Sequence, residues 1–410
     1  MRIDLTTGTG QQPVEIPDAN LLGVLEPNEV APVQDPGAEL DRLVAAAAGF
    51  LDAGHRVLVL VNDYTRPTPN ELILERLEPL LEGRDVRFLV CLGTHRPPRG
   101  REFERIFGPG FYARHAGQVD VHDCRDRGKL FFKGKTRRGT PVWFNRGLLR
   151  AERIIAVNSV EPHYFAGFTG GRKTFLPGVA AEETTACNHN LVIEPGSAPL
   201  RLEGNPVHED MAEAAAMLLR PVFSVQAVLD RARRLHSLYC GDLVESFARG
   251  AEDSRRIYAV PVDRPADIVL SVLGPPYDVN FYQAQRAVEF ARPVLKPGGV
   301  HITVSACRDG TGDSGFIEVF SGCRRAADVL ECMAGDRRFG WHKSARLAQV
   351  LARHDLYAVV GIDDATVRRV FMQPFASVQE ALDTALRRIG HGAGVYVIPD
   401  AGGVVPVLAG

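Results

Sequence analysis

The chain lacks the features that mark membrane, secreted and nucleic-acid-binding proteins. No segment of its 410 residues approaches the roughly 18 consecutive apolar residues of a membrane span. The N-terminal residues Met1–Gly10 have no apolar stretch of the kind found in signal peptides. The net charge is -2, and without any basic run beyond short pairs such as Arg137–Arg138 there is no footprint for a phosphate backbone. We therefore predict a cytoplasmic protein with neither nucleic acid nor a membrane as partner.

Cysteine usage argues against a disulfide framework. The seven cysteines are an odd number, they are scattered, and they form no Cys-x-x-Cys motif: Cys91, Cys124, Cys187, Cys240, Cys307, Cys323 and Cys332. This spacing fits reduced thiols, most of them small core residues, rather than a thiolate zinc site.

Lysine is also scarce, because only six of the 48 Lys and Arg residues are lysines. Lys173 stands in the segment Glu161–Gly178, which also holds a histidine and a cluster of glycines and is followed by His189. The alternative is a loop lysine that faces solvent, which the scarcity of the residue disfavours. We interpret Lys173 as an amine kept for covalent chemistry.

What the sequence does contain is an alternation of apolar strands and helices. Apolar residues make up 45% and charged residues 24%, as in globular proteins. Strands are expected at residues 56–62, 86–92, 153–158, 266–272, 299–304, 356–361 and 394–398, and helices at 39–53, 70–81, 208–219, 282–295 and 378–388. Because the strand runs are continuously apolar rather than alternating, we predict mainly parallel sheets buried on both faces, and hence an α/β fold.

A chain of this length suits two domains rather than a single core. We place the boundary near Val262–Pro265, where an arginine-rich helical stretch ends and a new strand begins. The predicted domains are residues 1–264 and 265–410. The residues up to about Pro17 are expected to form a strand pair, and residues 100–139 a hairpin or lid.

Polar residues follow three of the expected strands directly. Asp63 and Arg66 follow the first, His95 the second and His163 the third. Ligands of parallel sheets bind beyond the carboxyl ends of the strands, so we expect these side chains at one rim. Taken singly, each has an ordinary explanation as a loop residue or a local ion pair. Two imidazoles from different strands can, however, serve as acid and base near neutral pH.

Two further features bear on cofactors. Thr65 with Arg66 at a strand end is suited to a phosphate or carboxylate. The cluster around Gly170 and Gly171 resembles a P-loop, but Arg172 replaces the glycine that must precede the lysine, so a nucleoside triphosphatase is disfavoured. A glycine-rich turn that lets the backbone approach a bound cofactor remains.

His189 lies in a segment of helical character and is suited to binding a metal. No histidine or carboxylate at the position four residues on completes a zinc pattern. A metal held here would need ligands from something other than the protein.

Together these motifs resemble the nickel-dependent lactate racemase family. The matching pieces run over much of the chain in the family's order: Asp63-Tyr-Thr-Arg66-Pro, Gly93-Thr-His95-Arg, Glu161-Pro-His163-Tyr-Phe-Ala-Gly-Phe-Thr-Gly-Gly-Arg-Lys173, Pro177-Gly178, Asn188-His189 and Tyr282-Gln283. The resemblance implies two α/β domains with the active site in the cleft between them.

The cofactor of that family is a nickel-pincer nucleotide, a pyridinium mononucleotide whose two sulfur-bearing arms and one ring carbon hold nickel. The resemblance implies a thioamide tether to Lys173 and a fourth nickel ligand at His189, consistent with the planar geometry that Ni(II) favours. It implies the acid/base pair His95 and His163. It also implies that enzymes of cofactor synthesis are partners, and it leaves a homo-oligomer open.

Further roles carry over to the residues beside that pair. The resemblance implies that Thr65 and Arg66 lie near the nucleotide phosphate and that Asp63 supports the site. The implied reaction inverts the C2 centre of a 2-hydroxy acid, by racemisation or epimerisation. One histidine takes the hydroxyl proton while a hydride passes to the cofactor, and return of the hydride to the other face of the 2-oxo acid completes the inversion.

One position departs from the family's pattern. Where a substrate-contacting lysine is expected, after Tyr282 and Gln283, the chain has Arg286. Arginine can still hold a carboxylate in two parallel hydrogen bonds, but its planar head changes the pocket, so lactate becomes doubtful and a larger 2-hydroxy acid or a sugar acid is an equal expectation. Trp341 can line that pocket, although an ordinary buried tryptophan is an equal reading.

Two other functions stay open at this point. A lyase or hydrolase could use His95 and His163 with a simple metal ion. A non-catalytic nucleotide-binding protein would use the glycine cluster without any chemistry at Lys173.

Overall fold

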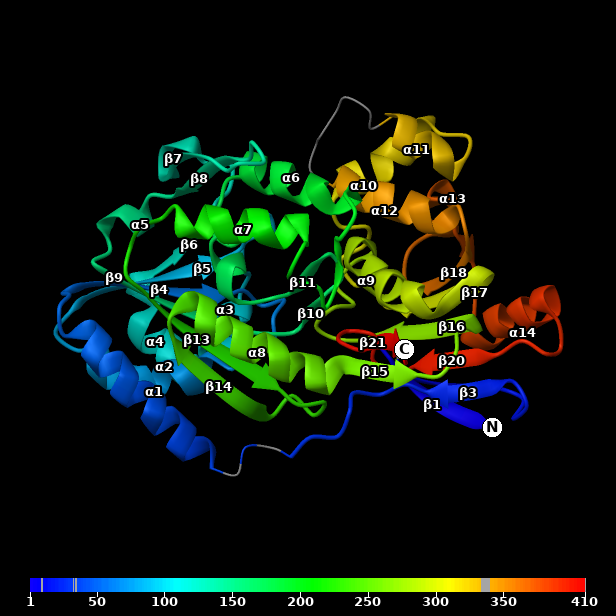
Figure 1. The fold of residues 1–410 in the computed structure, drawn as a ribbon, viewed down its shortest axis with the longest axis horizontal. Coiled ribbons are helices and arrows are strands. Elements are labelled where there is room, and N and C mark those ends of the chain that lie inside the picture. The colour runs from blue at the N-terminus through cyan, green and yellow to red at the C-terminus, as the bar shows by residue number, and fades with distance from the viewer. Residues whose placement is uncertain (9, 32, 34, 333–339, 410) are drawn as a thin grey trace. The chain divides into compact units, whose positions relative to one another are not determined.

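The computed structural model describes residues 1–410 except 9, 32, 34, 333–339 and 410 (Figure 1). The chain forms two compact units. One comprises Glu29–Ile257, and the other combines Met1–Asn28 with Tyr258–Gly410. Each unit is built on a six-stranded sheet, as described in turn below.

The unit of residues 29–257 carries a sheet of strand order β14-β13-β9-β4-β5-β6. Its strands are β4 (Arg56–Asn62), β5 (Asp85–Cys91), β6 (Val119–Val121), β9 (Arg153–Ser159), β13 (Val222–Leu229) and β14 (Leu235–Gly241). All neighbours are parallel except β13 and β14. The central strands β9, β4 and β5 are almost wholly buried, which explains their continuous apolar runs.

Helices and small sheets complete this unit. Its helices are α1 (Pro36–Leu51), α2 (Asn70–Leu81), α3 (Glu102–Phe107), α4 (Pro109–His115), α5 (Gly147–Arg150), α6 (Glu182–Asn190), α7 (Pro206–Ala216) and α8 (Leu243–Tyr258). A hairpin pairs β7 (Leu130–Lys135) with β8 (Pro141–Asn145), and a small sheet joins β10 (Pro162–His163), β11 (Ala166–Phe168) and β12 (Ala198–Pro199). One apolar core unites α1, α2, α3 and α4 with one face of the large sheet.

Two helix starts show how local sequence sets these elements. At α1 the Asp35 side chain accepts from the Ala38 N–H, and Pro36 occupies the first turn, where a proline costs no hydrogen bond. At α7 the Asn205 side chain accepts from the N–H groups of Val207 and His208. Both caps satisfy amide groups that a helix end leaves without intrahelical partners.

The other unit carries a fully parallel sheet of order β19-β18-β17-β16-β20-β3. Its strands are β3 (Leu21–Val24), β16 (Ala266–Leu273), β17 (Leu295–Ser305), β18 (Asp355–Val360), β19 (Gln373–Pro374) and β20 (Val395–Ile398). Its helices are α9 (Phe281–Ala291), α10 (Ser314–Glu318), α11 (Ala326–Cys332), α12 (Trp341–Leu351), α13 (Asp364–Arg369) and α14 (Val378–Ile389). Two strand pairs accompany the sheet, β1 (Arg2–Thr7) with β2 (Gly10–Glu15) and β15 (Ala259–Val262) with β21 (Val405–Leu408).

The fold class predicted from the sequence is confirmed, and the predicted strand pair at the N-terminus is present as β1 and β2. The domain limits differ at both ends of the predicted first domain. Residues 1–28 belong with the C-terminal residues, because β3 pairs with β20 and the Asn20 side chain donates to backbone carbonyls of His391 and Ala393. Residues 258–264 also belong there, because β15 pairs with β21.

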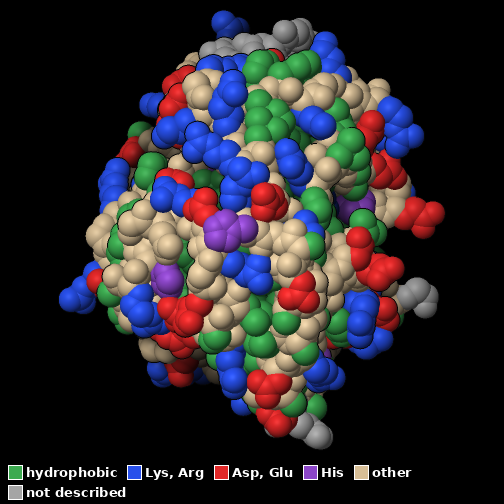
Figure 2. All heavy atoms as spheres, turned by 90° about the vertical axis from the view of Figure 1, so that its left-hand side faces the viewer, with side chains coloured by type: hydrophobic (Ala, Val, Ile, Leu, Met, Phe, Trp, Pro, Cys, Tyr) green, Lys and Arg blue, Asp and Glu red, His purple; other side chains and the backbone are tan. Residues whose placement is uncertain are grey.

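The segment of residues 100–139, expected to be a hairpin or lid, contains α3, α4, β6 and β7, and a hairpin is present only at its end, where β7 pairs with β8. On the face of the molecule drawn in Figure 2, basic and acidic side chains are intermixed. Exposed ion pairs, such as Arg125 with Glu182 and Arg127 with Glu183, also join basic and acidic side chains on the surface.

Within the described residues, no helix combines the length and apolarity needed to cross a bilayer.

Candidate active site

The ends of β4 and β5 bring Asp63 and His95 together. The two strands are parallel neighbours, so the residues that follow them emerge at the same edge of the sheet. The Nδ1 atom of His95 lies 2.6 Å from Oδ2 of Asp63. Asp63 is buried, whereas the His95 side chain is 27% exposed. Because a carboxylate only accepts, Nδ1 of His95 carries the proton, and the lone pair of the neutral imidazole is on Nε2.

His95, Arg66 and Thr65 keep the Asp63 carboxylate charged. The hydroxyl and the N–H of Thr65 donate to Oδ1 of Asp63 at 2.7 and 3.1 Å. Burial by itself would raise the pKa of Asp63, but the attraction of His95 and Arg66 and the hydrogen bonds from His95 and Thr65 outweigh it and lower the pKa. An ionised Asp63 therefore holds the His95 ring through its Nδ1–H group.

A second group of predicted site residues lies around the buried ring of Phe165. His163 and His189 contact this ring edge-on, with centroids at 4.5 and 5.0 Å, and Nζ of Lys173 lies 5.6 Å from its centroid. Nζ of Lys173 is 3.4 Å from Nε2 of His163. Lys173, the predicted tether, and the two histidines therefore pack against the same aromatic ring.

His163 is oriented by the backbone of its own small sheet. The N–H of Ala166 donates to Nδ1 of His163 at 3.3 Å. An amide N–H can only donate, so the exchangeable proton of His163 is on Nε2, the atom beside Lys173. Each of the two histidines is thus held through Nδ1 and presents Nε2.

The loop that carries Lys173 is shaped by its glycines. Gly170 and Gly171 have φ angles of 77° and 54°, which other residues rarely adopt. A Cβ atom on Gly171 would come within 2.7 Å of the Phe247 ring, and one on Gly170 within 2.6 Å of Oε1 of Gln226. Packing against α8 and β13 therefore accounts for both glycines, and their predicted contact with a cofactor stays a prediction.

Two hydrogen bonds join the Lys173 loop to the sheet edge that bears Asp63 and His95. The N–H of Gly93, just before His95, donates to the Gly178 carbonyl at 3.0 Å. The Thr174 hydroxyl donates to Oδ1 of Asn158, near the end of β9, at 2.6 Å. Motifs distant in the sequence are in this way fixed within one unit of the fold.

His189 lies in α6, as its helical surroundings predicted, and is 7% exposed. The described residues contain no group of three or more His, Cys, Asp or Glu side chains that could hold a metal ion. With a single imidazole as donor, this site suits a metal that arrives with ligands of its own.

The remaining predicted residues belong to the other unit. Tyr282, Gln283 and Arg286 lie on α9, and Trp341 begins α12. Arg286 is 2% exposed and its guanidinium stacks on Tyr277 and Phe290 at 4.3 and 5.1 Å from the ring centroids. The Gln283 N–H is capped by the Asn280 side chain.

Lys343 was not among the residues expected at this site. It is buried, its Nζ lies 3.9 Å from the Tyr282 ring centroid, and it donates to the Tyr282 carbonyl. The Tyr282 hydroxyl is in turn 3.3 Å from Nε2 of His342. The signal that could have found Lys343 is the one that pointed to Lys173, because it is another of the six lysines.

Comparisons with known proteins identify the family of the chain. The family model of the lactate racemase N-terminal domain matches residues 7–199, and that of the lactate racemase C-terminal domain matches residues 262–406. Lactate racemase of Thermoanaerobacterium thermosaccharolyticum is 29% identical over 361 residues, covering 85% of this chain and 84% of that protein. Lactate racemase of Lactiplantibacillus plantarum is 29% identical over 364 residues, covering 86% and 85%.

Two solved structures are similar to this chain in fold. The structure of the lactate racemase apoprotein from T. thermosaccharolyticum matches with a TM-score of 0.91 and 26% identity, over 99% of this chain and 100% of that one. A protein from Thermotoga maritima matches with a TM-score of 0.75 at 19% identity, over 91% and 98%, and this likeness concerns the fold alone.

Proposed function

The chain belongs to the lactate racemase family and is an isomerase, and we propose that it inverts the C2 centre of a 2-hydroxy acid through a 2-oxo acid. The observation that carries this proposal is the pair of histidines held through Nδ1, His95 by Asp63 and His163 by the Ala166 N–H. Inversion by hydride transfer needs one group that takes the hydroxyl proton and another that supplies it.

In the proposed reaction one imidazole takes the hydroxyl proton at Nε2, and the other, protonated on both ring nitrogens, returns a proton from Nε2 to the same oxygen once C2 has been inverted. For His163 the hydrogen bond from the Ala166 N–H to Nδ1 therefore belongs to the neutral ring and is released when both nitrogens are protonated. The proton count of the pair is therefore unchanged over a turnover. Asp63 stabilises the imidazolium of His95 while that histidine holds the proton.

The residues around Phe165 fit a nickel-pincer nucleotide. Lys173 would tether it through its amine, His189 would supply one ligand to the metal, and Thr65 and Arg66 would lie by its phosphate. The fit rests on the donor set, since one buried imidazole suits a metal that is otherwise held by the cofactor. When bound, this cofactor supplies the acceptor and donor of the C2 hydride. It would be supplied to the protein by separate cofactor-synthesis enzymes.

A 2-hydroxy acid carries a carboxylate next to the reacting hydroxyl, and the protein must bind this carboxylate. We propose that Arg286 binds this carboxylate, with Tyr282, Gln283 and Trp341 lining the pocket. Because the Arg286 guanidinium packs against the buried rings of Tyr277 and Phe290, it lacks the freedom of a lysine amine. The relatives are named for lactate, and this difference favours a larger 2-hydroxy acid here.

The test is a stereoinversion assay in D2O. The protein is produced together with the cofactor-synthesis enzymes and is given a panel of enantiopure 2-hydroxy acids that includes lactate. The proposal predicts inversion with the original hydrogen retained at C2, because a hydride that shuttles through the cofactor does not exchange with solvent.

Two outcomes contradict the proposal. Solvent deuterium at C2 would indicate removal of the C2 hydrogen as a proton. Activity gained by adding a divalent metal ion to the bare apoprotein, without inversion of any acid, would indicate a metal-dependent lyase or hydrolase instead.

A further inference from the structure

Asn188, which precedes the candidate metal ligand in α6, has an amide whose orientation is fixed. Its Nδ2 atom donates to the Val207 carbonyl at 3.1 Å and to Oδ2 of Asp210 at 2.9 Å. A backbone carbonyl can only accept, so the NH2 group must lie on this side and Oδ1 on the other. That oxygen lies 3.2 Å from Nδ1 of His189.

The consequence concerns the tautomer of His189. An amide oxygen can only accept, so the contact requires a proton on Nδ1 of His189. In a neutral imidazole the lone pair is then on Nε2. Side chains adjacent in a helix ordinarily point apart, so this contact is a particular arrangement of α6 rather than a general property of helices.

Asp210 fixes the Asn188 side chain by accepting a hydrogen bond from its amide group. It is fully buried and also accepts from the hydroxyls of Thr136 and Thr140 in the turn between β7 and β8. The Thr140 N–H donates to the Thr136 hydroxyl at 3.1 Å, which closes this turn. Asp210 thus ties the hairpin to α6 through buried hydrogen bonds, which are costly to break.

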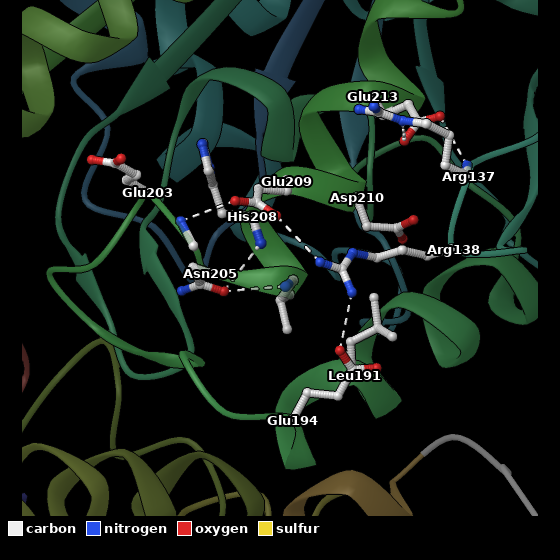
Figure 3. Close-up of polar contacts among 12 residues, drawn as sticks. Arg137, Arg138, Leu191, Glu194, Glu203, Asn205, His208, Glu209, Asp210 and Glu213 are labelled. Carbon is white, nitrogen blue, oxygen red and sulfur yellow. Dashed lines mark hydrogen bonds and ion pairs between the residues drawn. The ribbon is translucent and has the colours of Figure 1, made fainter.

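Figure 3 shows the exposed side of the same attachment. Arg137, in the hairpin turn, binds Glu213 of α7, and Arg138 binds Glu209 of α7 and Glu194 beyond α6. Exposed pairs of this kind contribute little stability individually. The buried acid Asp210, which lies between Glu209 and Glu213 on α7, is therefore the main anchor.

We propose that Asn188, held by Asp210, is a positioning residue that fixes His189 as the Nδ1–H tautomer and so presents Nε2 as the metal ligand. Partners of this type commonly set the tautomer and orientation of metal-binding histidines. The inference rests on the proposed function for the identity of the metal, whereas the tautomer is a property of the protein alone.

The experiment measures that tautomer directly in the cofactor-free full chain. Long-range proton–nitrogen correlation spectra of protein labelled with 15N-histidine distinguish the two neutral forms, and His189→Gln identifies the His189 signals. The wild type is expected to show the Nδ1–H form in large excess. Asn188→Ala should convert His189 to a mixture of both forms.

Thr185→Val is the matched control. Thr185 is another fully buried polar residue of α6, and its hydroxyl donates to the Ala181 carbonyl within the same helix turn. It should leave the His189 tautomer as in the wild type. An Nε2–H form in the wild type overturns the proposal, and this decides the matter even if Asn188→Ala fails to fold. An unchanged tautomer in a folded Asn188→Ala protein also overturns it.

A second measurement separates this inference from the proposed function. Protein produced with the cofactor-synthesis enzymes is dialysed and its nickel content followed over time. Asn188→Ala should lose nickel about 10–100-fold more readily than Thr185→Val, the range typical for loss of such a partner. If the wild type shows the expected tautomer yet never carries nickel, the proposed function fails while the positioning role stands. Equal nickel retention in the two variants contradicts the positioning role.

Discussion

Asp63 illustrates how a single residue can set the chemistry of a site. It is a buried carboxylate, and its charge is maintained by His95, Arg66 and the Thr65 hydroxyl despite the cost of burial. Of these, the His95 contact is the shortest, at 2.6 Å. Replacing the carboxylate by an amide removes this charge and leaves a single acceptor oxygen for His95 on one side and Thr65 on the other.

We expect Asp63→Asn to lower kcat by about 10²–10⁴-fold, the range in which acid–base catalysis contributes. The amide oxygen can accept from Nδ1 of His95 only with its NH2 group turned toward Thr65, and it carries no charge to balance a proton held by His95. The effect is measured from kcat of the purified variant. Asp120→Asn, at an exposed acid paired with Arg87, is the control. A normal kcat in a folded Asp63→Asn protein would refute the role of Asp63.

At the scale of elements, the parallel strands made part of the site predictable. Asp63 and His95 follow strands that are visible as apolar runs, and strand ends of a parallel sheet share an edge. The residues around His189 could not be derived in this way. Asn188, Asp210 and the Thr136–Thr140 turn are brought together by packing of two helices and a hairpin, which no periodicity encodes.

The short 3-10 helix Gly171–Thr174, which carries Lys173, provides the test at this scale. Gly171→Ala places a Cβ 2.7 Å from the Phe247 ring in a conformation that alanine rarely adopts. We expect a loss of about 1–3 kcal/mol in the free energy of unfolding, from overpacking. Denaturant unfolding of the isolated variant measures it.

A control variant and a compensating double variant accompany this measurement. Gly117→Ala adds a Cβ with nothing within 4 Å and should leave stability nearly unchanged. Gly171→Ala combined with Phe247→Leu should recover part of the loss, since the smaller side chain relieves the contact. A Gly171→Ala protein as stable as the wild type would show that the loop is not held by this packing.

At the scale of the whole molecule, the sequence predicted the fold class but not how the chain is divided. The N-terminal strand β3 has only four residues, Leu21–Val24. So short a run does not predict that the strand pairs with β20 at the far end of the chain. Such pairing depends on contacts between residues far apart in the sequence. The same holds for Lys343, which reaches Tyr282 only after α9 and α12 have packed.

Both units contain a buried histidine that should make stability depend on pH. Burial lowers the pKa of His122 from 6.5 to about 4 and that of His301 to about 3. The unfolded chain therefore binds these protons first as the pH falls. The stabilisation is complete above pH 6.5 and is lost progressively toward the folded-state values, by up to roughly 1.4 kcal/mol per pH unit for each histidine.

His122→Gln should reduce this slope. Nε2 of His122 donates to the Ala180 carbonyl at 2.9 Å, a bond that an amide can replace without a titrating group. Thermal unfolding at a series of pH values from 7 to 4.5 measures the slope. His55→Gln, at an exposed histidine, should behave like the wild type. Identical slopes in all three proteins would mean that His122 does not titrate as its burial requires.

The central claim is that Lys173 carries the cofactor, and peptide mass spectrometry of active protein tests it most directly. Protein produced with the cofactor-synthesis enzymes, and shown to invert a 2-hydroxy acid, is digested and analysed beside Lys173→Arg, which keeps the charge but lacks the amine. The account predicts an added mass confined to the wild-type peptide that contains Lys173, together with bound nickel. An active protein with an unmodified Lys173 peptide and no nickel would contradict it.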